Sequence, residues 1–163
     1  MLRTLQQILK TGIVTEVPPA PAEELRVREA LQSRIREVLG RALCIRAVDA
    51  GSCNGCELEI HALGNPIYSI ESLGIRFVAS PRHADLLLVT GPVSRHMEVA
   101  LRRTYDATPD PKLVVAVGDC GACGGVFGDG YASCGAVSNV IAVDVVVPGC
   151  PPSPARVLAG ILA

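Results

Sequence analysis

The hydrophobic residues of this chain follow two patterns, short runs and longer segments with helical spacing. The runs are rich in Val, Leu and Ile without alternation of apolar and polar residues, which is typical of strands buried on both faces of a parallel sheet. They predict strands at residues 43–48, 75–80, 85–91, 112–119 and 140–149. Helices are predicted at residues 21–39, 56–63, 95–105 and 153–162. This alternation predicts a doubly wound α/β domain with a mostly parallel sheet.

The N-terminal part of the chain has a different character. Residues 2–13 place apolar side chains at the spacing of one helix face, with polar side chains on the other side. Residues 16–24 are rich in proline and are interpreted as a spacer. We therefore expect an amphipathic helical extension over residues 1–40 and an α/β domain over residues 41–163. Two interpretations of the amphipathic segment stay open: packing on its own domain, or docking on a membrane surface or a partner subunit.

The composition adds an expectation of metal or redox chemistry. Of the 163 residues, 49% are hydrophobic and 19% are charged, which indicates burial against partners as well as in the core. The net charge of −1 gives no basis for nucleic-acid binding. No apolar stretch reaches the roughly 18 to 20 residues of a spanning helix, and no export signal is evident, so we expect a cytoplasmic location. Seven cysteines in such a chain indicate metal or redox chemistry rather than disulfides.

Four of the cysteines follow predicted strands. Cys53 and Cys56 come after the first strand, Cys120 directly follows the strand at 112–119, and Cys150 follows the last strand. In open α/β sheets, ligands bind beyond the carboxyl ends of the strands. We therefore expect these thiols to meet at one edge of the sheet, among glycines that let the backbone approach closely.

Three interpretations of these cysteines are open from the residues alone. A thioredoxin-type dithiol would use only Cys53 and Cys56 and leave the other two unexplained. A zinc site could combine that pair with Cys120 and Cys123, although 63 residues separate the two pairs and Cys150 is then left out. An iron–sulfur site uses all four converging thiols and is the favoured interpretation.

Spaced motifs then indicate a family. The sequences "CNGC" at 53–56, "GDC" with "GG" at 118–125 and "PGCPPSP" at 148–154 resemble the small-subunit family of [NiFe] hydrogenases, in the short branch shared with the 20 kDa subunit of respiratory complex I. The segment "SPRHADLLLVTGPV" at 80–93 is also similar to that branch. The resemblance implies a flavodoxin-like fold and one [4Fe–4S] cluster, with Cys53, Cys56, Cys120 and Cys150 as its ligands.

The form of the first motif separates the branches of this family. Complex I subunits typically carry two adjacent cysteines there, whereas Cys53 and Cys56 have the hydrogenase spacing. The chain therefore looks like the small subunit of membrane-bound, energy-converting or formate-hydrogenlyase-type hydrogenases. That resemblance implies a large-subunit partner with a NiFe site, a ferredoxin-like iron–sulfur subunit, membrane subunits, and a peripheral position on the cytoplasmic face of the membrane. A quinone-reducing subunit with a nickel-free partner and a zinc-stabilised interaction module without redox function are the alternatives.

Further residues near the motifs have weaker signals. The resemblance implies that Glu57, directly after a ligand, lies on a proton route toward the large subunit; the alternative is a first-turn acid stabilised by the helix dipole. Residues 90–92 are expected to line the cluster. Cys44 and Cys134 are expected to be buried apolar residues, Glu59 to be solvated or at an interface, and His61, His83 and His96 to have structural roles. Cys123 could compete for iron, but Cys120 is the expected ligand. Two roles stay open for Asp119 and Asp129, tuning of charge near Cys120 or interface contacts.

Overall fold

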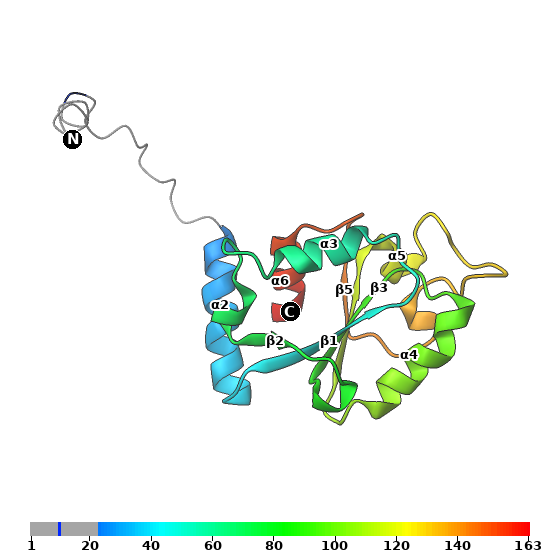
Figure 1. Cartoon of the computed structure of the whole chain (residues 1–163), viewed down its shortest axis with the longest axis horizontal. Helices are drawn as coiled ribbons and strands as arrows, with labels where there is room; N and C mark the ends of the chain where they lie inside the picture. The colour runs from blue at the N-terminus through cyan, green and yellow to red at the C-terminus, as the bar shows by residue number, and fades with distance from the viewer. Residues whose placement is uncertain (1–9, 11–22) are drawn as a thin grey trace, which may run out of the picture.

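Five strands form one sheet in which every hydrogen-bonded pair is parallel. The computed structural model describes residue 10 and residues 23–163 (Figure 1). The strands are β1 Leu43–Asp49, β2 Ile75–Phe77, β3 Leu86–Thr90, β4 Leu113–Val117 and β5 Val145–Val147. Their spatial order is β2-β1-β3-β4-β5. This is the flavodoxin-like order, so the prediction of a flavodoxin-like α/β fold is confirmed.

Helices cover both faces of the sheet. They are α2 Glu23–Leu39, α3 Gly55–Ala62, α4 Arg95–Ala107, α5 Gly118–Cys123 and α6 Pro154–Leu162, with the 3₁₀ turns η1 Ile70–Leu73, η2 Pro81–His83 and η3 Val137–Asn139. Figure 1 shows α2, α3 and α6 on one side of the strands and α4 on the other. Ser94 caps the N-terminus of α4, because its hydroxyl accepts a hydrogen bond from the backbone N–H of Met97.

The two faces of the sheet pack into separate hydrophobic clusters. On β3, Leu86 and Leu88 belong to the cluster under α2, α3 and α6, whereas Leu87 and Val89 belong to the cluster under α4. All four side chains are at most 2% exposed. A strand buried on both faces needs apolar residues at every position, which explains why its sequence shows no alternation.

Helix α2 contributes to the first of these clusters. Leu31 and Ile35 are buried against it, and α2 lies beside α6 and η1. The Arg28 guanidinium donates to the carbonyl of Ile67 at 2.7 Å, and the Gln32 amide donates to the carbonyl of Ser72 at 2.9 Å. The amphipathic segment predicted at 2–13 lies outside the described residues, so the division of the chain at residue 40 stays a prediction.

Three of the strand predictions are too long. Residues 140–144 do not belong to β5: the Asp144 carboxylate accepts a hydrogen bond from the N–H of Val114 at 2.8 Å and brings this segment to the start of β4 as a loop. Strand β2 ends at Phe77, and Ser80 then caps η2. The prediction at 112–119 also runs into α5, which sequence analysis missed, because Gly118 turns the chain with a φ of 84°.

Within the described part of the chain, no helix combines the length and the hydrophobicity that crossing a membrane requires.

Replacing Leu88 with alanine should destabilise the fold strongly. Leu88 is 0% exposed in the central strand β3, and removing a buried leucine side chain costs about 2 to 5 kcal/mol because a cavity is left behind. The Val99→Ala variant on α4 is the control, since Val99 is 56% exposed and its truncation should cost less than about 1 kcal/mol. Urea denaturation followed by circular dichroism measures both. Equal midpoints would contradict the assignment of Leu88 to the core.

Candidate iron–sulfur site

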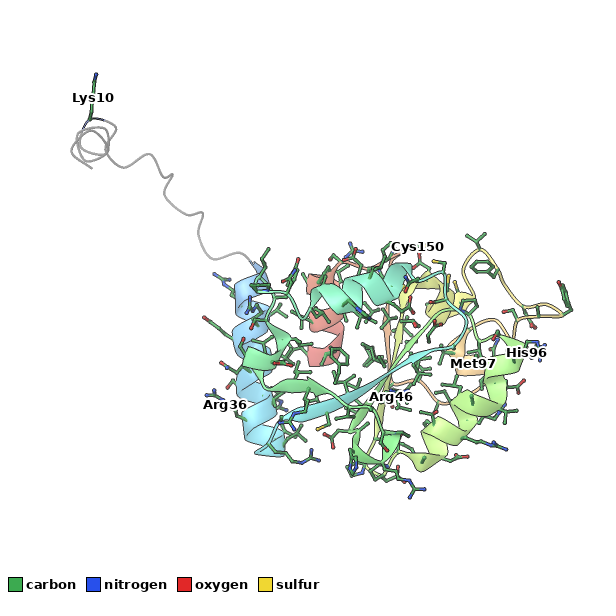
Figure 2. The ribbon with its side chains drawn as sticks, viewed as in Figure 1. Lys10, Arg36, Arg46, His96, Met97 and Cys150 are labelled. Atoms are coloured by element: carbon green, nitrogen blue, oxygen red, sulfur yellow. The ribbon has the colours of Figure 1, made fainter. Side chains whose placement is uncertain are left out.

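The four cysteines that follow strands line one cavity at the carboxyl edge of the sheet. Cys53 and Cys56 come from the turn after β1 and the start of α3, Cys120 from α5 after β4, and Cys150 from the turn after β5. Figure 2 labels Cys150 at this edge, beside the start of α3 and close to α5. The remaining lining residues are Ser52, Gly55, Gly91, Asp119, Gly149 and Pro151.

The thiols differ in their exposure to solvent. Cys56 is buried and Cys120 is half-buried, whereas Cys53 and Cys150 are exposed. The site therefore has one side against the protein core and one side open to the surface. A group held there is within reach of a partner that covers the open side.

Two glycines make room for the inner thiols. A Cβ atom on Gly118 would lie 2.6 Å from the Sγ of Cys56, and one on Gly125 would lie 2.7 Å from the Sγ of Cys120. Both glycines also have positive φ values, 84° and 53°. Any other residue would collide with a thiol and strain the backbone, so these glycines are required by the site itself.

Burial and neighbouring charge act on the thiols in the same direction. The pKa of Cys56 is raised to about 12, first by burial and then by the negative charges of Glu57, Cys120, Cys53 and Cys150. The pKa of Cys120 is also raised, by burial and then by Cys150, Cys53 and Asp119, while a hydrogen bond from the backbone of Val126 lowers it. Four thiolates crowded in this way need a positive centre to neutralise them, because metal binding displaces thiol protons.

The possible donors in this cavity are four thiols. Among residue 10 and residues 23–163, no three or more His, Cys, Asp or Glu side chains are arranged to hold one metal ion. Tetrahedral zinc needs four donors at about 2.0 to 2.3 Å from one centre. Four thiols with no histidine in the lining form a donor set that iron–sulfur clusters use, and that structural zinc sites of four cysteines also use.

Glu57 is the one residue of the site region with an unsatisfied buried carboxylate. It lies in the first turn of α3, directly after Cys56, and both its carboxylate oxygens are buried without a hydrogen-bond partner from the described residues. Leaving a buried carboxylate without a hydrogen bond is unfavourable, so such a group calls for a partner.

The other sequence candidates lie outside the cysteine cavity or at its rim. Cys123 is exposed and its thiol donates to the carbonyl of Asp119 at 3.2 Å. Cys134 is buried and donates to the Glu98 carboxylate at 3.4 Å, and Cys44 is a half-buried residue of β1. Asp129 is mostly exposed and pairs with Arg95.

Of the histidines and residues 90–92, only Gly91 lines the cysteine cavity. His61 lines a separate cavity with Arg46 and Phe77, and Figure 2 shows His96 on α4, away from Cys150. Of the three residues expected to line the cluster at 90–92, Gly91 lines the cavity, whereas Thr90 is buried in β3 and donates to the carbonyl of Val48. Glu59 is half-buried on α3, and His83 lies in η2.

Sequence analysis missed some of the lining residues. Ser52 and Pro151 were not singled out, although each is adjacent to a cysteine, which is the signal that could have found them. For Asp119, tuning of charge or an interface contact was expected, and a contact with another loop of the cavity was not. Its contact partner lies 30 residues away in the chain, so no local pattern could have revealed it.

Comparison with known proteins identifies the family. Residues 53–163 match the family model described as "NADH ubiquinone oxidoreductase, 20 Kd subunit". The chain belongs to this family. The match covers all four cysteines of the cavity, and the resemblance inferred from the motifs is confirmed.

Curated relatives come from two kinds of complex. The chain is 44% identical over 138 residues to "Probable membrane-bound hydrogenase subunit mbhJ" of Pyrococcus furiosus, covering 83% of each chain. It is 43% identical over 131 residues to "Formate hydrogenlyase subunit 7" of Escherichia coli, covering 80% of this chain but only 51%, about half, of that protein's length. It is also 47% identical over 108 residues to one of the NADH-quinone oxidoreductase subunits of Herpetosiphon aurantiacus, covering 66% of this chain and 60% of that one.

Solved structures agree with the fold. A chain of the membrane-bound sulfane sulfur reductase, an archaeal respiratory membrane complex, superposes with a TM-score of 0.65 at 33% identity and covers 86% of this chain and 72% of that one. A chain of an NAD⁺-reducing [NiFe]-hydrogenase has a TM-score of 0.54 at 19% identity, covers 70% of this chain and 85% of that one, and supports the fold alone. Members of the family are subunits of oxidoreductase complexes, and this chain is a member of that family.

The metal-free protein should lose stability as the pH rises from 9 toward 12. The ordinary pKa of a cysteine thiol is 9.0, so below this pH Cys56 is neutral in both the folded and the unfolded chain. Above it, the thiol ionises in the unfolded chain, whereas in the folded chain its pKa of about 12 keeps it protonated. Ionisation then favours the unfolded state, by on the order of 1 kcal/mol per pH unit. Urea midpoints at about pH 8 and about pH 10 measure this loss.

The Cys56→Ser variant is the matched control for this prediction, because serine does not ionise in the range. Its stability should fall less between the two pH values. An identical fall in both proteins would contradict the raised pKa of Cys56.

Proposed function

We propose that this chain is the electron-transfer subunit of a membrane-bound [NiFe] hydrogenase complex and holds one [4Fe–4S] cluster. The observation that supports this most is the meeting of four thiols, from three separate loops, in one cavity at the carboxyl edge of the sheet. The cluster ligands would be Cys53, Cys56, Cys120 and Cys150. Bound there, the cluster would supply reversible one-electron transfer.

The chain's own residues set the conditions for that transfer. Cys56 and the apolar residues beneath it exclude water from the inner side of the site. The backbone N–H of Val126 faces the thiol of Cys120, and hydrogen bonds of this kind tune the potential of a bound cluster. No substrate bond is made or broken on this chain, and the catalytic site belongs to a partner.

The surface around the site fits a chain that works inside a complex. Val126, Phe127 and Tyr131 are 95%, 60% and 100% exposed in the loop that follows Gly125, and Leu58 on α3 is 63% exposed. Large exposed apolar side chains around a site mark an interaction surface. A large subunit with a NiFe site is the proposed partner at this edge, with a ferredoxin-like subunit and membrane subunits completing a complex on the cytoplasmic face of the membrane.

A quinone-reducing or other nickel-free complex is the second candidate. The similarity to a member of an NADH-quinone oxidoreductase and to a chain of the sulfane sulfur reductase supports it. The Cys53–Cys56 spacing favours the hydrogenase assignment. The zinc module is the least supported, because the family and the similar proteins are subunits of oxidoreductase complexes.

Metal analysis and EPR of the complex, purified anaerobically through a tag on this chain, test the proposal. About four irons attributable to this chain, a reduced [4Fe–4S] signal and co-purifying nickel are expected. Iron without nickel would transfer the assignment to the second candidate. Zinc without iron would contradict both.

Replacing a ligand should remove the cluster, and replacing another cysteine should not. We expect Cys120→Ser and Cys150→Ala to lose the iron of this chain, because each removes one of the four thiolates. Cys134→Ala and Cys123→Ala are the matched controls, since neither thiol lines the cavity, and both should keep it. Iron quantification and the EPR signal decide, and full iron in Cys120→Ser would contradict the ligand assignment.

Glu57 is proposed to carry protons between this chain and the large subunit. Both its carboxylate oxygens are buried and unpartnered among the described residues, so its carboxyl group can exchange a proton with an acceptor across the interface. Glu57→Gln should lower hydrogen turnover by at least about tenfold while leaving the iron content and EPR signal unchanged. Glu59→Gln is the control, two residues further along α3. Unchanged turnover in Glu57→Gln would contradict the role.

A further inference from the structure

Two loops of the cysteine cavity are joined by a pair of hydrogen bonds between Asp119 and Gly149. The Asp119 carboxylate accepts from the backbone N–H of Gly149 at 2.7 Å. The backbone N–H of Asp119 donates to the carbonyl of Gly149 at 2.9 Å. A charge-assisted bond to a carboxylate is short and strong, and two bonds to one residue fix its orientation as well as its distance.

The position of this pair makes it specific to the site. Asp119 directly precedes Cys120, and Gly149 directly precedes Cys150, so the bonds join the residues just before two thiols from different strands. Both residues line the cavity. A third thiol lies nearby, since a Cβ on Gly118, the residue before Asp119, would lie 2.6 Å from the Sγ of Cys56 and 3.3 Å from the carbonyl oxygen of Gly149.

Asp49, at the end of β1, makes a useful contrast with Asp119. The Asp49 carboxylate accepts from the N–H groups of Gly51 and Ser52, at 2.8 Å each, and so shapes only the loop to which it belongs. Asp119 is different, because its side chain connects residues 30 positions apart in the chain.

We propose that Asp119 is a positioning residue that holds the loops of Cys120 and Cys150 at the separation a bound cluster requires. This inference rests on the proposed function. The oxygen of the carboxylate sets the separation of the two loops, and its negative charge, at the wall of the cavity, favours the oxidised state of a bound cluster and lowers its potential.

Two variants separate these effects. Asp119→Asn keeps a side-chain oxygen that can accept from Gly149 and removes the charge, so iron should be lost to a chelator at close to the wild-type rate while the cluster potential shifts upward. Asp119→Ala removes the oxygen, and iron should be lost about tenfold faster or more. Asp106→Ala, on the exposed end of α4 near the opposite edge of the sheet, is the control and should match the wild type in both measurements.

The measurements are chelator-driven iron release, a potentiometric EPR titration and hydrogen exchange of the Gly149 amide, all on the purified complex. Hydrogen exchange of the Gly149 amide should be accelerated about tenfold or more in Asp119→Ala. The same exchange can be measured on the metal-free protein. Circular dichroism then shows whether the variant is still folded.

The outcomes separate the inference from the proposed function. Wild-type protein without iron would contradict the proposed function, and the exchange at Gly149 would then test the contact between the loops by itself. Wild-type iron release and wild-type exchange in Asp119→Ala would overturn the inference. An Asp119→Asn variant that loses iron as fast as Asp119→Ala, or that shows an unchanged potential, would overturn it too.

Discussion

The parallel direction of all five strands is the constraint on which the site depends. Because every strand runs the same way, the loops after β1, β3, β4 and β5 meet at a single edge. The chain leaves β1 toward β2 on one side of the sheet, whereas β3, β4 and β5 follow one another on the other side. Cys53 and Cys56 therefore arrive from one direction, Cys120 and Cys150 from the other, and Gly91 after β3 lies in the wall between them.

The close packing of that edge explains its composition. The thiols of Cys56 and Cys120 occupy the positions that side chains on Gly118 and Gly125 would need, so only glycine fits at these two positions. The same crowding raises the pKa of Cys56 and Cys120. A site made of four crowded thiols is unfavourable when all of them are ionised and empty of metal, and it becomes favourable when a cationic iron–sulfur core neutralises them.

The surface beyond the site suggests how the chain is used in a complex. Cys53 and Cys150 are exposed, and the loop after Gly125, which starts next to Cys120, also exposes large apolar side chains. The carboxylate of Glu57, unpartnered among the described residues, lies in the same region, next to Cys56. These features have one physical cause in common: each would be stabilised by a protein partner that excludes water from this edge.

Most regular elements could be predicted from local patterns. The five strands and the helices α2, α3, α4 and α6 lie where the apolar runs and the helical spacing indicated them. The errors fall where distant contacts overrule local preference. Residues 140–144 are as rich in branched apolar residues as a strand, but the bond from Val114 to Asp144 makes them a loop. Helix α5 has only six residues, too few for a periodic pattern.

The sequence by itself determined the identity of the family and the four cysteines worth testing, because both depend on short motifs whose spacing is written along the chain. Only the tertiary structure decided that these thiols share one cavity, that the oxygens of Glu57 are buried without a partner among the described residues, and that Asp119 binds Gly149. The physical reason is range. A motif involves neighbours a few residues apart, whereas the contact between Asp119 and Gly149 depends on how β4 and β5 pair, and that pairing is a property of the whole sheet.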